Sequence, residues 1–224
     1  MLYLGSHRNR TSCANKELQE KSEINTNHKN IIVMKRISLS LLSLLIVFGA
    51  LASSPTFFSA KSHELKISGT SNLHDWTASV PRMNTSAELV VVNGKLEAIN
   101  RMVVEIDATA IKGSEGSIMD RKIAETLKAD KNPNIVFRMT RINEISQTGS
   151  DFNVRAAGTL TVGGVNRPLD VVVKGRVLSN GEVQFTGVKD MKMTTWQLNP
   201  PRAMMGALRT ADDVTVNFSV TLKN

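Results

Sequence analysis

Cysteine and histidine are scarce in this sequence. The single cysteine, Cys13, precedes an apolar segment that is predicted to be removed, and no cysteine follows that segment. A disulfide, a thiol nucleophile, a cysteine metal site and lipoprotein acylation are therefore excluded in the remaining chain. His63 and His74 are the only histidines there, whereas a metal site needs three or four ligands. We predict neither a metal nor a cofactor.

Aromatic residues make up only 4% of the sequence, and no tyrosine follows Tyr3. A platform on which nucleic-acid bases stack is therefore not expected. Half of the formal net charge of +8 lies before Ser53, and a nucleic-acid-binding domain usually carries a clustered basic face. We predict no nucleic-acid partner. A weak attraction to acidic head groups, and with it transient membrane contact, remains open.

Long apolar runs are absent except at residues 37–51. This run follows Met34-Lys35-Arg36 and ends in Ala50-Leu51-Ala52, which is the pattern of a secretory signal peptide. It is short for a membrane-spanning helix, which needs roughly 20 residues. We predict cleavage near Ala52 and a periplasmic or secreted protein. An uncleaved membrane anchor is the alternative.

The chain is predicted to consist of a leader followed by one folded domain. Residues 1–33 are polar and show no apolar period, so we expect them either to be missing from the mature protein or to form a disordered tail. Residues 34–52 are the signal peptide, and residues 53–62 a short linker. Residues 63–224 have the size of one ordinary domain.

The domain alternates apolar and polar residues at period two, which is typical of β-strands with one buried face. The last such segment is the clearest, with one face formed by Val214, Val216, Phe218, Val220 and Leu222. Turn signals separate the segments. Asn93-Gly94 suits a two-residue hairpin of type I′, and Asn180-Gly181 and Gly163-Gly164 mark two further hairpins.

One segment breaks the alternation. In residues 117–129 apolar side chains recur at helical spacing, with Ser114 or Ser117 as the expected cap and Asn132-Pro133 as the end signal. The pattern predicts one short helix among about eight to ten strands joined by hairpins. Without βαβ alternation, this favours an all-β fold, an up-and-down antiparallel β-barrel.

Three segments resemble the YceI-like family in their order and spacing. They are residues 68–76, residues 130–137 with the pattern Lys-x-Pro-x-Ile-x-Phe, and residues 158–169. The resemblance covers residues 64–222. It implies an exported, lipocalin-like barrel of eight strands with a helix near its mouth, and a dimer formed through an edge or the helix. It also implies long apolar ligands such as polyisoprenoids, isoprenoid quinones and fatty amides.

An interior lined by Val, Leu, Ile and Phe favours an apolar ligand, because each buried CH₂ group contributes about 0.8 kcal/mol. We predict a binding protein that carries or sequesters an isoprenoid, an isoprenoid quinone or a fatty-acid derivative, and not an enzyme. Small side chains at Ala156 and Gly158 are expected to leave room beside Phe137 and Phe152. The candidate ligand-binding residues are the inward positions and their neighbours at the mouth: Leu65, Ile67, His74, Trp76, Val104, Ile106, Ile123, Leu127, Phe137, Met139, Phe152, Val154, Ala156, Leu160, Val171, Phe185, Trp196, Val216 and Phe218.

Polar clusters offer weaker alternatives. On a strand, His74 and Asp75 point to opposite faces, so they are not expected to form a catalytic dyad. Glu105 and Asp107 share a face opposite an apolar row and are interpreted as solvated. Four cations are candidates for a ligand head group or, alternatively, plain surface charge: Arg121, Lys122, Arg202 and Arg209.

Two other functions remain open at this point. One is a structural or stress-related adaptor that binds protein and has a filled barrel. The other is an enzyme acting on lipids, which would need a polar pair buried among the apolar rows.

Overall fold

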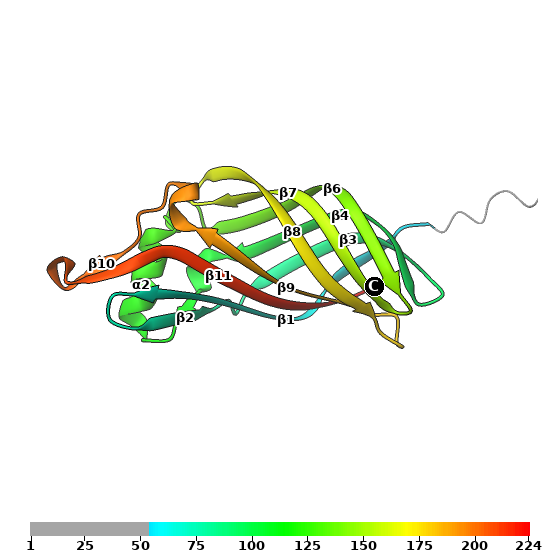
Figure 1. The fold of residues 1–224 in the computed structure, drawn as a ribbon, viewed down its shortest axis with the longest axis horizontal. Helices are drawn as coiled ribbons and strands as arrows, with labels where there is room; N and C mark the ends of the chain where they lie inside the picture. The colour runs from blue at the N-terminus through cyan, green and yellow to red at the C-terminus, as the bar shows by residue number, and fades with distance from the viewer. Residues whose placement is uncertain (1–53) are drawn as a thin grey trace, which may run out of the picture. The chain divides into compact units, whose positions relative to one another are not determined.

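Eight antiparallel strands pair side by side in a closed ring in the computed structural model, which describes residues 54–224 (Figure 1). In ring order they are β1 (Thr56–Ser71), β3 (Met83–Val92), β4 (Lys95–Asp107), β6 (Asn134–Thr148), β7 (Asp151–Val162), β8 (Val165–Val177), β9 (Val183–Lys192) and β11 (Leu208–Lys223). Pairing between β11 and β1 closes the ring. The predicted all-β barrel is confirmed, while the predicted signal peptide and leader lie outside the described residues.

The remaining elements gather at one end, which we call the mouth end (Figure 1). They are β2 (Asp75–Ser79), η1 (Ala108–Ala110), β5 (Lys112–Gly113), α2 (Ser117–Thr126), η2 (Met193–Trp196), β10 (Arg202–Ala203) and η3 (Met204–Gly206). β2 pairs with β1, β5 with β2, and β10 with β11, so they extend the wall beyond the ring. The other end carries the β3–β4, β6–β7 and β8–β9 connections, and we call it the closed end.

The first strand begins earlier than expected. β1 starts at Thr56, where Thr56–Ser59 pair with Leu89–Ser86 of β3. Phe58 is only 5% exposed and belongs to the core. Residues 56–62 are therefore part of the barrel and not a linker.

Two of the three predicted hairpins have the tight two-residue turn that their sequences indicate. Asn93 (φ 50°) and Gly94 (φ 73°) both have the positive φ that a type I′ turn demands, and so do Gly163 (φ 56°) and Gly164 (φ 82°). At the β8–β9 connection only Gly181 has a positive φ, and its N–H donates to the Leu178 carbonyl. That connection is a wider turn than predicted.

The predicted helix exists, but its cap is different. α2 ends at Thr126, and its N-cap is Gly116 (φ 83°) with no side-chain cap. Neither Ser114 nor Ser117 caps it, and the Ser114 hydroxyl accepts from the Thr77 N–H instead. Asp120 in the first turn holds the helix to β5, since its carboxylate accepts from the Gly113 N–H at 2.7 Å. Among residues 54–224 no helix is long and apolar enough to cross a membrane.

The inward rows divide the barrel into a solid part and a hollow part. At the closed end the inward side chains are almost completely buried, the largest being Phe152, Leu89, Leu96, Val183 and Leu222. Toward the mouth the same rows continue with side chains that are only half-buried, for example Val216 and Val171. This change in burial along one continuous row indicates open space in the upper half of the barrel.

Candidate functional site

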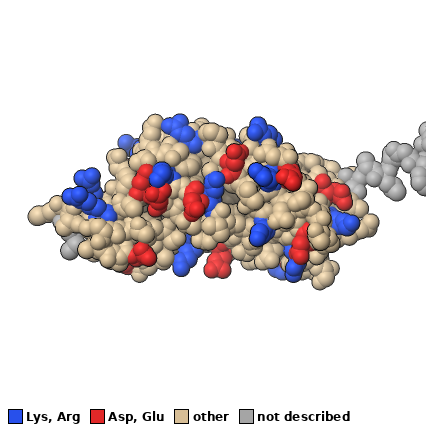
Figure 2. Space-filling view, in the orientation of Figure 1, with Lys and Arg blue, Asp and Glu red and all other residues tan. Residues whose placement is uncertain are grey.

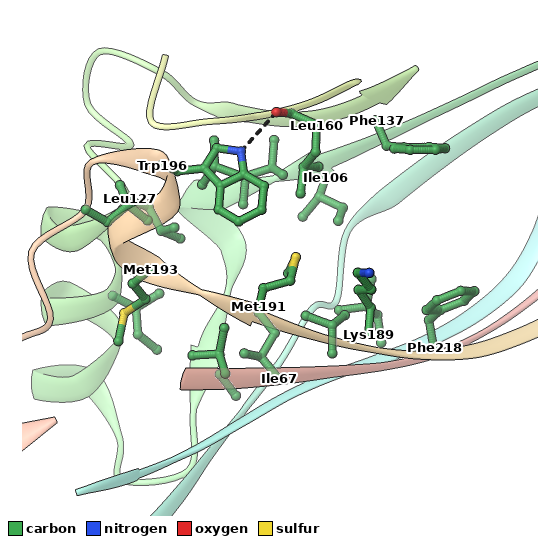
Figure 3. Close-up of a pocket in the computed structure, with 18 of the residues that line it drawn as sticks. Ile67, Ile106, Leu127, Phe137, Leu160, Lys189, Met191, Met193, Trp196 and Phe218 are labelled. Carbon is green, nitrogen blue, oxygen red and sulfur yellow. Dashed lines mark hydrogen bonds between the residues drawn. The ribbon is translucent and has the colours of Figure 1, made fainter. Parts of the chain in front are cut away.

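That space is a cavity of about 570 Å³ between the closed-end core and α2 (Figure 3). Its volume lies in the range of about 300–1,000 Å³ that small-molecule sites occupy. The lining is predominantly aliphatic, aromatic and methionine side chains from the barrel strands and from α2. A completely filled barrel, which the adaptor alternative required, is therefore not what the sequence forms.

Nearly all the candidate residues line this cavity. The lining contains Leu65, Ile67, His74, Trp76, Val104, Ile106, Ile123, Leu127, Phe137, Met139, Val154, Ala156, Leu160, Val171, Phe185, Trp196, Val216 and Phe218. Phe152 is the exception, since it does not border the cavity and is only 2% exposed. Its ring meets that of Phe185 edge to face with the centroids 5.3 Å apart, which makes it part of the floor.

Gly158 does not leave the room beside Phe137 that the sequence suggested, whereas Ala156 does line the cavity. The Phe137 ring lies over Gly158, so that a Cβ atom added there would overlap it. The Phe152 ring covers Gly175, its partner on β8, in the same way. Glycine therefore lets an aromatic ring from the next strand lie flat on the wall, and the ligand space lies beyond these rings.

At the mouth end, β8 and β9 separate, and a buried tryptophan lies between them. Their pairing ends at Lys174 and Thr186. Beyond that point the Nε1 of Trp196, which is 4% exposed, donates to the Leu160 carbonyl at 3.0 Å (Figure 3). Trp196 packs in a second core cluster that also contains Met193 and Leu198. This cluster closes the wall where backbone pairing stops.

α2 lies over the cavity and is not packed into a solid core. Ile123 and Leu127, one turn apart, line the cavity, yet the helix has no fully buried residue. Asp120 holds the helix to β5 by accepting from Lys112 Nζ at 2.8 Å and from the Gly113 N–H. These hydrogen bonds, that of Lys112 first, lower the pKa of Asp120 from its ordinary 3.8. α2 thus covers the cavity through partly buried apolar side chains and is held to β5 by the hydrogen bonds of Asp120.

The rim of the cavity carries His74 and Trp76. His74 Nδ1 lies 3.3 Å from Glu115 Oε1, and both side chains are about half exposed. The Trp76 ring covers Gly69, and its Nε1 donates to the Thr70 carbonyl at 3.2 Å.

The other polar candidates lie outside the cavity, with one exception. Glu105 is paired with Arg138 at 3.9 Å, and Asp107 accepts from the Thr109 N–H at 2.9 Å beside η1. Lys122 reaches the cavity rim and is paired with Glu125 at 2.7 Å. Three exposed cations do not line the cavity: Arg121, Arg202 and Arg209. Within the described part of the chain, no three potential metal ligands lie together.

Lys189 and Thr85 are two of the polar lining residues that the sequence analysis missed; Ser71, Glu115, Thr126, Lys192 and Thr210 also border the cavity. Lys189 lies on the inward row of β9, and Figure 3 shows its nitrogen directed into the cavity between Met191 and Phe218. Thr85 on β3 is 5% exposed, and its Oγ1 has no hydrogen-bond partner. The expectation of an interior almost without polar atoms is wrong at these two positions. Continuing the alternation from Phe185 through Gly187 would have found Lys189.

Comparison with known proteins gives a consistent result. A family model described as YceI-like domain matches residues 51–222. A polyisoprenoid binding domain from Saccharophagus degradans, implicated in plant cell wall breakdown, has a TM-score of 0.58 and 14% identity, covering 74% of this chain and 97% of that chain. BcnA of Burkholderia cenocepacia has a TM-score of 0.54 and 18% identity over 71% of this chain and 95% of that chain.

A third structure, the Campylobacter jejuni YCEI protein, has a TM-score of 0.50 and 17% identity over 66% of this chain and 84% of that chain. At these identities the solved structures establish a shared fold only. No curated protein matches the chain in sequence.

Proposed function

Because the chain belongs to the YceI-like family, we propose that it is an exported protein that binds an amphiphilic apolar ligand inside its barrel. The ligand class is an isoprenoid, an isoprenoid quinone or a fatty-acid derivative. The observation that carries the proposal is the apolar cavity of about 570 Å³ below α2. The shared fold of the polyisoprenoid binding domain from Saccharophagus degradans supports a ligand of this kind.

The physical basis is that transfer from water into such a lining is favourable for an apolar ligand and unfavourable for a polar one. Each CH₂ group moved from water into the cavity contributes about 0.8 kcal/mol. A ligand with several polar groups would lose hydrogen bonds to water and find few partners. Binding without catalysis is the matching proposal, since the His74–Glu115 pair lies at the half-exposed rim and not among the apolar rows.

Two neighbouring valines provide a matched test of binding. Val171 lines the cavity, whereas Val172 is 59% exposed on the outer face of the same strand. Val171→Phe places a larger side chain in the cavity and leaves less space for a ligand, so affinity should fall about tenfold, which corresponds to about 1.4 kcal/mol. Val172→Phe adds the same side chain outside and should leave affinity unchanged.

Intrinsic fluorescence can report this binding, because both tryptophans of the sequence line the cavity. The full chain would be titrated with geranylgeraniol and with hexadecan-1-ol, and an organic extract of purified protein would be analysed by mass spectrometry. Saturable binding that Val171→Phe weakens supports the proposal. An extract without any apolar molecule, combined with no response to either alcohol, would refute it.

Export is the second part of the proposal. The segment that carries it, residues 34–52, precedes the described residues, and its charged start, apolar run and Ala-x-Ala ending support cleavage near Ala52. Cell fractionation followed by N-terminal sequencing should find a product that starts near Ser53 in the periplasm or the medium. Retention of the whole chain in the membrane would favour the uncleaved anchor instead.

We further propose transient contact between the mouth and a membrane, which would let an apolar ligand pass without crossing water. Three exposed apolar side chains come from three mouth segments: Leu73 (61% exposed), Ile118 (73%) and Met205 (109%). Arg202 and Arg209 pair across β10 and β11 close by, and Figure 2 shows basic side chains at this end. Apolar tips flanked by cations suit an anionic lipid surface.

Vesicle co-sedimentation tests this contact. Leu73→Ser with Met205→Ser should weaken binding of the full chain to vesicles that contain phosphatidylglycerol. The control is Val188→Ser, which removes a side chain that is 60% exposed on the barrel wall. Equal sedimentation of both variants would count against a membrane-facing mouth.

A further inference from the structure

Lys189 is an unusual residue for the position that it occupies. It projects from the inward face of β9, where the same row carries Phe185 toward the closed end and Met191 toward the mouth (Figure 3). Its partner on β11 is Val216, which also lines the cavity. The ammonium group thus lies among apolar side chains, well inside the rim at which the other charged lining residues are found.

The other charged side chains of the lining are each paired. Lys122 meets Glu125 at 2.7 Å, and Lys192 meets Asp213 at 2.6 Å. Glu115 lies 3.3 Å from His74. No hydrogen bond or ion pair joins Lys189 Nζ to another residue of the described chain.

An unpaired cation in apolar surroundings is costly, because the wall cannot replace the water that solvates it. A hydrocarbon ligand that filled the cavity would increase this cost by displacing water from Nζ. A ligand that carries an anionic group would instead supply the missing partner. The residue therefore distinguishes between ligands that share the same apolar chain.

The number of unpaired charges in the cavity limits the charge that the ligand's head group can carry. One unpaired ammonium balances one negative charge, as in a carboxylate, and its three N–H donors match the oxygens of that group. A diphosphate would bring further negative charges, which the apolar lining near Lys189 would leave without partners.

On the basis of the binding function proposed above, we propose that Lys189 is the head-group site of the cavity and that it selects a monoanionic amphiphile, a long-chain carboxylate. The carboxylate lies against Nζ inside the barrel, and the chain occupies the apolar space around it. The ligand class is thereby narrowed from neutral isoprenoids to fatty-acid anions.

The experiment compares two probes with the same chain, hexadecanoate and hexadecan-1-ol, by titration of the full chain and its variants. The native protein should prefer hexadecanoate by at least about tenfold, the effect expected of one charge-assisted hydrogen bond. Lys189→Met should abolish this preference and still bind the alcohol. Lys189→Arg should keep the preference, and so should Lys174→Met, which removes an exposed lysine of β8 that does not line the cavity.

The outcomes separate this inference from the proposed function. Equal affinity of the native protein for both probes, or a preference that survives Lys189→Met, overturns the role of Lys189 and leaves apolar binding intact. Absence of binding to either probe or to geranylgeraniol overturns the binding function itself. Circular dichroism of each variant shows whether a loss of binding reflects unfolding.

Discussion

The ring of Phe218 on β11 lies directly over Gly187, the residue opposite it on β9. Gly187 is two residues before Lys189 on the inward row, so the missing side chain leaves a place for the ring beside the ammonium group. Trp76 lies over Gly69, its partner on β1, in the same arrangement. Aromatic rings that lie on glycines keep the wall thin and its inner surface smooth.

Gly187→Ala should therefore destabilise the barrel. The new Cβ would overlap the Phe218 ring and push it toward the cavity, which we expect to lower the free energy of unfolding by about 1–3 kcal/mol. Urea denaturation gives this value. Asn217→Ala, on the outer face of β11, is the control and should change stability by less than about 0.5 kcal/mol.

Thr85→Val should act in the opposite direction. Thr85 Oγ1 is buried without a hydrogen-bond partner, and removing such a group should raise the free energy of unfolding by about 1 kcal/mol. Thr140→Val is the matched comparison, because its hydroxyl donates to the Ala157 carbonyl at 3.1 Å and should give no gain. A destabilised Thr85→Val variant would show that this hydroxyl has a partner in solution.

Phe152→Ala tests the floor of the cavity. The ring is 2% exposed and contacts Phe185, so its removal should cost about 3–5 kcal/mol of unfolding free energy. The cavity should then extend toward the closed end and accept longer chains. Ligand-length profiles with alkanols of increasing chain length would detect this, and an unchanged profile would mean that the floor had collapsed into the gap.

The ion pair between Asp120 and Lys112, which holds α2 to β5, should weaken when Asp120 is neutralised by mutation or by acid. Asp120→Asn keeps the size of the side chain but removes the ion pair with Lys112, so the amides of residues 117–126 should exchange hydrogen faster. Global stability should change little, because a solvent-exposed ion pair contributes little to folding. Asp151→Asn, which removes an ion pair with Arg176 at the closed end, should leave exchange in α2 unaffected.

The direction of the acid effect follows from the pKa of Asp120, which folding lowers from 3.8. The carboxylate is fully ionised above that value, so its contribution to stability is complete at neutral pH. It is lost only as the pH falls below 3.8 through the folded-state pKa. A loss of protection in α2 that began near pH 7, measured as hydrogen exchange relative to the intrinsic amide rate at each pH, would contradict this assignment.

The barrel and most of its lining could be predicted from the sequence because period-two alternation is local. Rows such as Val214, Val216 and Phe218 identify both a strand and its inward face without knowledge of the partner strands. The start of β1 was missed, since a bulge between Ala60 and Ser62 interrupts the alternation there. The Asn93-Gly94 turn was predictable because positive φ is a property of the residues themselves.

The features of the mouth depend on long-range contacts and were not predictable in the same way. The hydrogen bond from Trp196 to Leu160 joins residues far apart in the chain, at a place where β8 and β9 no longer pair. Lys189 escaped notice for a different reason. A lysine on an inward row breaks the binary pattern, and Gly187 before it has no side chain to mark the face, so the strand seemed to end at Phe185.

The two ends of the described chain leave the barrel at the same pole. Ser59 near the start of β1 pairs with Lys223 near the end of β11, at the pole opposite α2 (Figure 1). A fusion partner or a surface linker joined to either end would therefore hold the protein by its base, with the opening facing outward. Arrays of such tethered barrels would keep every entrance accessible, which makes immobilised capture of amphiphiles from solution a direct use of this geometry.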